Sequence, residues 1–262
     1  MSLLVGIVVD MTTFTSDVTV LHQAEQFQAA PFGGVFRANK PVVGGHSADG
    51  QLSAGLFYWS HSRFHDDFEF GLHHHEGFEI ATFILEGENS HYDTATRQWV
   101  DLHAGDVQII RSGSGVSHNE RVAKGSRAFQ IWWDPGYHEA LRDQPSYTDH
   151  AASAFTPHSD GDAFVTDLIG GDGPVLARTE GLSVQRIAVP AGARADLEVG
   201  PHRFTLGYLI AGIGTVDGVA VTDNDAVSLN GASAVTVSAD APIDIFVVSV
   251  PAKPSYQPIR QG

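Results

Sequence analysis

The chain has 262 residues, of which 42% are hydrophobic and 18% charged, a composition typical of a globular protein and not of a disordered one. It contains no cysteine, which excludes disulfides, thiolate metal sites and cysteine nucleophiles. Because 31 acidic residues stand against 15 Lys and Arg, the formal net charge is -16, which argues against direct contact with nucleic acid or an anionic membrane.

Residues 1–20 are expected to form an extension ahead of the folded part. Residues 3–9 are apolar, but this run is too short to span a bilayer, and no Lys or Arg precedes it to make a signal peptide. Met11 is an alternative natural start, in which case the first ten residues are a translation or cloning extension. We expect a soluble, cytoplasmic protein.

Short strands separated by turns dominate the pattern from residue 21 to residue 136. The clearest strands are residues 78–86, 107–110 and 129–133, each next to a turn that contains glycine or proline. The only stretch that indicates a helix is brief, from Tyr137 to Arg142. This spacing predicts an all-β fold of the sandwich or barrel type.

Two pairs of side chains that suit a metal lie at strand spacing. His73 and His75 are two residues apart, and so are His118 and Glu120 about forty residues later. Alternate residues of a strand project from the same face, so each pair points in one direction. If the two strands lie side by side, three imidazoles and one carboxylate converge. Such a set suits a divalent transition metal that keeps open coordination positions.

The second half of the chain reads as a degenerate copy of the first. Residues 204–212 resemble residues 78–87, and residues 224–229 resemble residues 105–110. This repetition predicts two similar β-domains packed together. The copy keeps His202, but no second histidine lies two residues away and nothing after Leu229 replaces His118 and Glu120. We therefore expect a second domain without metal.

The two ligand motifs resemble those of the pirin family of bicupins. The first likeness is His-x-His-x-Gly-Phe-Glu at residues 73–79, followed by Leu85-Glu86-Gly87 and by His91-Tyr92-Asp93. The second is Gly105-Asp106-Val107-Gln108 with Ser112-Gly113-Ser114-Gly115 and His118-Asn119-Glu120. Segments 129–133 and 144–147 also fit, so that the likeness covers about residues 20 to 250, and the paired motifs are far more specific than a lone His-x-His.

The resemblance implies two antiparallel cupin barrels of the jelly-roll type with few short helices. An N-terminal metal-binding domain would span residues 21–136, a linker with a short helix residues 137–172, and a degenerate C-terminal domain residues 173–262. The implied ligands are His73, His75, His118 and Glu120. Fe(II) is the ion expected first, and Mn, Co, Ni, Cu or Zn also suits these donors.

One alternative and one departure accompany this assignment. In many other cupins the carboxylate ligand comes from the first motif, which here is Glu79, four residues after His75 and on the same face by strand parity. We prefer Glu120, which leaves Glu79 to support the site from behind. The departure is His74-His75-Glu76, where pirin-like chains usually have Pro-His-Arg, so that the charge beside the pocket is reversed. His74 should point away from the metal.

Other polar residues near the motifs are interpreted as structural. His61, His65, His91 and His103 are expected to be solvated surface histidines. Gln108 and Gln130 should line the first barrel, either to bind substrate or to satisfy backbone groups. Of the adjacent pair Trp132 and Trp133, one indole should enter the core and the other should point outward.

The resemblance supports two functions from different classes. The first is a quercetin 2,3-dioxygenase-like oxidoreductase that acts with dioxygen on a small aromatic or enediol substrate, with Glu120 shifting between metal ligand and proton acceptor. The second is a regulatory protein or transcriptional cofactor whose metal tunes its affinity for a protein partner. Fold similarity does not choose between them. Open coordination positions on an oxygen-competent metal favour the enzyme.

Overall fold

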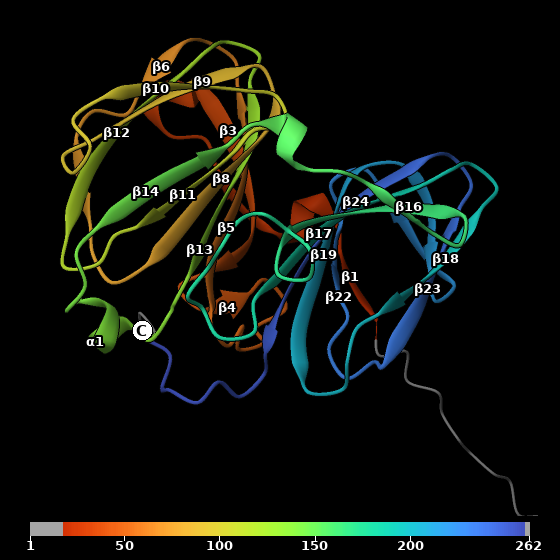
Figure 1. The fold of residues 1–262 in the computed structure, drawn as a ribbon. Helices are drawn as coiled ribbons and strands as arrows, with labels where there is room; N and C mark the ends of the chain where they lie inside the picture. Colours follow the sequence, from red (N-terminus) through yellow and green to blue (C-terminus); the bar gives the residue numbers. More distant parts are fainter. Residues whose placement is uncertain (1–17, 260–262) are drawn as a thin grey trace, which may run out of the picture.

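The computed structural model describes residues 18–259, which are arranged almost entirely as antiparallel β-strands (Figure 1). The α-helix in this range is α1 (Tyr137–Ala140), and short 3-10 turns occur at η1 (Gln23–Glu25), η2 (Phe32–Gly34) and η3 (Ala152–Ala154). No helix within the described range has the length and apolar character needed to cross a membrane.

The first barrel is built from a large and a small sheet. The large sheet has the order β14-β11-β8-β13-β5-β3-β2, with β4 paired to β3. In chain order its strands are β2 (Phe27–Ala29), β3 (Phe36–Val43), β4 (His46–Ser47), β5 (Leu56–Phe64), β8 (Glu79–Glu86), β11 (Val107–Arg111), β13 (Arg127–Trp133) and β14 (Ser146–His150).

The small sheet of the first barrel carries most of the residues that the sequence singled out. Its order is β10-β9-β12-β6, and β7 also pairs with β12. Its strands are β6 (Phe68–Glu69), β7 (His73–His75), β9 (Glu88–Asp93), β10 (Trp99–His103) and β12 (Val116–Val122).

The second barrel repeats this plan. Its large sheet has the order β1-β22-β19-β24-β17-β16-β15 and its small sheet the order β18-β23-β20-β21. The strands are β1 (Thr19–Leu21), β15 (His158–Asp160), β16 (Ala163–Ile169), β17 (Ser183–Val189), β18 (Arg194–Glu198), β19 (Arg203–Ala211), β20 (Ile213–Val216), β21 (Val219–Thr222), β22 (Ala226–Ser228), β23 (Ala234–Ala239) and β24 (Ile243–Pro251).

The matching strand orders confirm the predicted all-β bicupin. The run β11-β8-β13-β5 of the first barrel corresponds to β22-β19-β24-β17 of the second, and the sequence repeat had already paired the first two strands of each run. Figure 1 shows the two barrels side by side, the first in orange to green and the second in teal to blue.

The segment expected to be a linker, residues 137–172, contributes strands to both barrels. β14 pairs with β11 at the edge of the first large sheet, while β15 and β16 join the second. Each of these short strands forms hydrogen bonds with backbone N–H and C=O groups that an open sheet edge would otherwise expose. This pairing explains why the segment forms strands although its sequence shows little periodicity.

The N-terminal segment also contributes a strand to the second barrel. Residues 19–21, counted above within the extension, form β1 and pair with β22 of the second barrel (Figure 1). The remainder of the expected extension, residues 1–17, and the alternative start at Met11 lie outside the described residues.

The largest apolar core lies between the two large sheets, not inside either barrel. Alternate residues of β5 and β13 point toward the second barrel, including the fully buried Trp59, Phe129 and Trp133, and they meet Tyr208 and Phe246 from β19 and β24. The other alternate residues of β5, β8 and β13 point into the first barrel. Strand parity thus divides each strand between an interface that joins the barrels and an interior that is free to be polar.

Candidate metal centre

His73, His75 and His118 meet on the inner face of the small sheet. β7 and β12 are antiparallel neighbours in which His118 is paired with His73 and Val116 with His75. Because the three side chains share one face, one nitrogen from each ring lies within 4.8 Å of one from each of the other two. The ring centroids of His73 and His118 are 4.3 Å apart. The sequence predicted this convergence from parity alone.

Glu120 lies next to this triad and belongs to a second, overlapping group. Its carboxylate, His91 and His118 offer donor atoms that also lie within 4.8 Å of one another. Within residues 18–259, this group and the histidine triad are the sets that could hold a metal ion. The four predicted ligands therefore belong to two groups that share His118. Glu120 is in the group that contains His91.

Two glutamine amides hold the Glu120 carboxylate. Gln130 Nε2 donates to both carboxylate oxygens, at 3.2 and 3.1 Å, and Gln108 Nε2 donates to Oε1 at 3.2 Å. Trp132 Nε1 donates to Gln130 Oε1 at 3.1 Å, which fixes the Gln130 amide with its NH2 group toward Glu120. The glutamines therefore satisfy a buried carboxylate, a role that neither sequence interpretation included.

Several imidazole nitrogens of the triad have no hydrogen-bond partner among residues 18–259. His75 Nε2 and both ring nitrogens of His118 are buried and unpaired. His73 is oriented by its Nδ1, which lies 2.9 Å from the Gly71 carbonyl oxygen and leaves Nε2 free. Buried polar atoms are almost always paired in native proteins, so such a cluster calls for a missing partner. A transition metal ion fits, because it accepts the nitrogen lone pairs that no donor satisfies.

Burial keeps two of these histidines neutral. Desolvation, followed by repulsion from His118 and His73, lowers the pKa of His75 to about 3. Desolvation and repulsion from His73 and His91 lower the pKa of His118 to about 3. Neutral imidazole is the form that binds a metal, so His75 and His118 are in the form of ligands at physiological pH.

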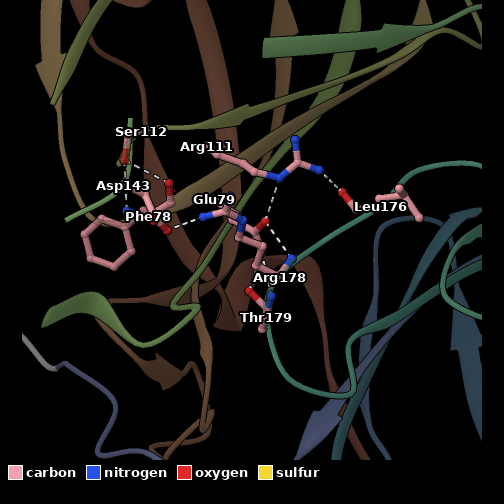
Figure 2. A network of polar contacts seen from close by, with 8 residues as sticks. All are labelled: Phe78, Glu79, Arg111, Ser112, Asp143, Leu176, Arg178 and Thr179. Carbon is pink, nitrogen blue, oxygen red and sulfur yellow. Dashed lines mark hydrogen bonds and ion pairs between the residues drawn. The ribbon is translucent and has the colours of Figure 1, made fainter. Parts of the chain in front are cut away.

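The competing carboxylate, Glu79, points toward Arg111, Arg178 and Thr179 (Figure 2). It is 1% exposed and accepts hydrogen bonds from the Arg178 and Thr179 amides at 2.8 Å and from Thr179 Oγ1 at 2.7 Å. Arg111 Nε lies 3.3 Å from the same carboxylate. Glu79 thus ties the first barrel to the segment leading into the second, and the structure places Glu120, not Glu79, beside the imidazoles.

The parity argument for Glu79 does not hold because the chain changes sheets after His75. β7 belongs to the small sheet and β8 to the large one, and Gly77 between them has φ of 74°. This left-handed turn resets which face the following residues occupy. Ile80 and Thr82 then face the barrel interior, whereas Glu79 faces the second barrel.

His91 is buried, which corrects its interpretation as a surface histidine. It is 1% exposed, its Nε2 lies 3.0 Å from Asp93 Oδ2, and its ring stacks on Tyr147 at 4.5 Å between centroids. Asp93 is itself fixed by the amides of the turn that follows it, at Ala95 and Thr96. When His91 Nε2 donates its hydrogen bond to Asp93, the neutral ring carries a lone pair on Nδ1. This buried atom has no hydrogen-bond partner among the described residues.

The remaining histidines divide between surface and interface. His65 and His103 are exposed, as the sequence predicted, and His74, which was expected to point away from the metal, is exposed too. His61 is the second correction: it is 1% exposed, and its Nδ1 lies 2.9 Å from the Tyr208 hydroxyl oxygen of the second barrel. Loop-like sequence around these residues concealed that β5 and β9 are interior strands.

Aromatic side chains line the approach to the histidines. The Trp132 ring lies 4.8 Å from His75, and the Phe70 ring lies 6.2 Å from His73. Trp132 points into the first barrel, while Trp133 is fully buried between the barrels. The two indoles thus point in opposite directions, as predicted, but neither points outward to solvent in the way that was expected. Behind Glu120, the barrel encloses a cavity of about 110 Å³.

Comparison with known proteins supports the resemblance drawn from the motifs. Residues 48–133 match the family model described as Pirin, and this span contains all four predicted ligands. A pirin-like protein from Caulobacter vibrioides is 27% identical over 199 residues, which cover 74% of this chain and 82% of that protein. These matches confirm the resemblance of the chain to pirin-like proteins.

Two further proteins extend this comparison. A quercetin 2,3-dioxygenase from Escherichia coli K12 is 24% identical over 185 residues, covering 70% of this chain and 76% of that protein. The crystal structure of a bacterial pirin from Escherichia coli in complex with nickel(II) is 18% identical, with a TM-score of 0.74, and covers 90% of this chain and 100% of that one. At this identity the structural likeness supports the fold alone.

Proposed function

We propose that this chain, whose residues 48–133 match the pirin family, is a metal-dependent dioxygenase of the quercetin 2,3-dioxygenase type. The observation that carries the proposal is the meeting of His73, His75 and His118, with unpaired ring nitrogens, beside Glu120. Three imidazoles and a carboxylate suit Fe(II) and leave positions open for dioxygen or a bidentate substrate. The substrate class we infer is a small aromatic or enediol compound with adjacent oxygens.

A bound divalent metal would supply Lewis acidity and, where the ion is redox-active, a route for electrons between substrate and dioxygen. The histidines would hold it, and Glu120 would complete the set or accept a proton from a substrate hydroxyl. Gln108 and Gln130 keep the carboxylate in place, so that it meets the substrate without rearrangement of the barrel.

The shape of the barrel indicates the side from which a substrate arrives. Ligand pockets usually measure about 300–1,000 Å³, whereas the cavity behind Glu120 measures about 110 Å³. That space is too small for a polycyclic aromatic molecule. His73 and His75 are partly exposed, and the His75 ring lies next to the Trp132 ring. The substrate would therefore approach over these histidines and pack against Trp132.

The test combines metal content with oxygen uptake. Protein purified without added metal is reconstituted separately with Fe(II), Mn(II), Co(II) and Ni(II), and dioxygen consumption is recorded with quercetin. Substrate-dependent uptake in at least one form, lost in His118→Ala and kept in His103→Ala, supports the proposal. His103 is the matched control because it is an exposed histidine on β10, away from the triad.

Two results would count against the proposal in different ways. Full metal occupancy without uptake of dioxygen would overturn the oxygenase and leave the regulatory role, which a metal-dependent pull-down of a protein partner would then test. Failure to bind any of the four ions would overturn the metal centre itself.

A further inference from the structure

Three arginines stand in a row across neighbouring strands of the first large sheet. Arg37 of β3 is paired in register with Arg63 of β5, and Arg63 is paired with Arg127 of β13. Residues paired in this way project from the same face, which here is the face turned away from the barrel interior. A row of like charges is unexpected in a chain with 31 acidic and 15 basic residues.

Such a row opposes folding unless something neutralises it. Like charges directly opposite each other on adjacent strands are destabilising. Burial and the charge of Arg127 lower the pKa of Arg63, against the opposing effect of Glu86 and Asp223. Arg127 has a partner, Glu86, at 2.7 Å. Among residues 18–259, Arg37 and Arg63 form no ion pair with a carboxylate.

The two arginines without carboxylate partners open onto a large cavity. Its volume is about 910 Å³, within the range of small-molecule sites. Among the described residues, none that lines it is acidic. The polar ones are amides, imidazoles and guanidinium groups, namely Gln23, Gln28, Arg37, Asn39, His61, Arg63 and His65.

His61 forms part of the floor of this cavity. It is 1% exposed, and its Nε2 is buried without a hydrogen-bond partner. The other ring nitrogen is engaged with the Tyr208 hydroxyl. His61 and Arg63 lie two residues apart on β5 and share one face, so an unpaired nitrogen here indicates that a polar partner is missing.

The groups that face the row from the second barrel do not neutralise it. Asn224 accepts a hydrogen bond from Arg63 through its side-chain oxygen, and the Ile210 carbonyl oxygen lies 3.5 Å from Arg127 NH2. Asp223 acts on Arg63 electrostatically but uses Oδ1 to accept a hydrogen bond from the Gly212 amide. Arg37, at the outer end of the row, has none of these neighbours as a partner.

We propose that this cavity is a binding site for a small molecule that carries an oxyanion, either a carboxylate or a phosphate group. Arg37 and Arg63 would bind the oxyanion as charge-assisted donors, for which guanidinium geometry is suited. The site lies on the opposite face of β5 from the candidate metal centre, and it does not depend on the proposed oxygenase activity.

The test measures binding of two probes, inorganic phosphate and succinate, to the full chain by calorimetry and thermal unfolding at constant ionic strength. We expect at least one probe to bind and to raise Tm. Arg37→Gln should weaken binding by about tenfold, the effect of losing one charge-assisted hydrogen bond. Binding of only one probe would identify the head group and support the site.

Arg37→Gln also separates binding from folding. Because Arg37 is exposed and repelled by Arg63, the variant without anion should be as stable as the original chain or more stable. A variant that folds well but no longer responds to the probe is the expected signature. Arg63→Gln provides a second variant from the same row.

Two control variants establish that binding is specific to this cavity. Arg194→Gln removes an exposed strand arginine from β18 of the second barrel and should leave probe binding unchanged. His118→Ala disables the candidate metal centre and should also leave it unchanged. The proposal is overturned if neither probe binds, if Arg37→Gln and Arg63→Gln respond like the original chain, or if His118→Ala abolishes binding.

Discussion

The two barrels share a strand order but differ in what their interiors contain. In the first, the positions on β7 and β12 that face inward are His73, His75, His118 and Glu120. In the second, β18 and β23 occupy the same places in the small sheet, and their inward residues are Ala195, Leu197, Val235 and Val237. One fold thus supports either a polar centre or an apolar core, and the side chains, not the fold, carry the chemistry.

This difference has an energetic side. The interior of the second barrel is stabilised by apolar burial. The first contains several buried nitrogens without partners, each of which costs about 1–3 kcal/mol when left unsatisfied. Metal binding should offset that cost, since a ligand that binds only the folded state adds to its stability. Without metal, the first barrel is therefore less stable than it would be with an apolar interior. The polar interior provides a binding site in return.

The largest expected effect lies at the junction between the barrels. Glu79→Ala removes the carboxylate that joins Arg111 of the first barrel to Arg178 and Thr179. Because this leaves two amides and a partly buried guanidinium without their carboxylate partner, we expect a loss of about 3–5 kcal/mol in the free energy of unfolding. Urea unfolding measures it. A loss below about 1 kcal/mol would show that the two barrels do not depend on this contact.

The next effect separates the barrels by their metal content. His118 is shared by both groups that could hold a metal ion, so His118→Ala should lower metal affinity by at least about a hundredfold. The metal content of the purified protein should then fall from about one ion per chain to almost none. His202→Ala removes an exposed histidine of the second barrel and should have no effect. Elemental analysis of both variants measures the difference. Equal occupancy in the two variants would contradict the placement of the site.

The pH dependence of stability should have a component from His61 at the interface. Burial, Arg63 and Arg127 lower the pKa of His61 in the folded chain well below 6.5, so that as the pH falls His61 is protonated in the unfolded chain before it is protonated in the folded one. The contribution of neutral His61 to the free energy of unfolding is therefore fully present above pH 6.5. It is lost as the pH falls below this value, by about 1.4 kcal/mol per pH unit for one group. His61→Gln should reduce this slope, as urea unfolding between pH 7 and 5 would show. An unchanged slope would mean that His61 does not remain neutral in the fold.

The smallest expected effect concerns His91. His91→Phe keeps a ring against Tyr147 but removes the nitrogen near His118 and Glu120. Residues that support metal ligands typically contribute about 10–100-fold in affinity, and we expect the lower end of this range. Competition with a chelator measures the change in Co(II) affinity. Affinity equal to that of the original chain would limit His91 to packing.

The sequence predicted local features well and long-range ones poorly. The strand pairs His73/His75 and His118/Glu120 follow from the period of two, and the repeat of residues 78–87 at 204–212 predicted the second barrel. The burial of His61 and His91 could not be foreseen, because both depend on strands from distant parts of the chain. Buried and less buried side chains alternate along residues 88–93 in the structure, but the polar sequence of this strand has no matching apolar alternation that could have found His91.

By itself, the sequence determined the all-β fold, the internal repeat and the side chains that share a strand face with a metal-type partner. These are consequences of short-range geometry, since adjacent residues fix which way each side chain points. Only the tertiary structure decided that Glu79 joins the barrels, that the glutamines hold Glu120 and that three arginines form a row. Each of these depends on register and sheet assignment, which are set by packing between strands that lie far apart in the chain.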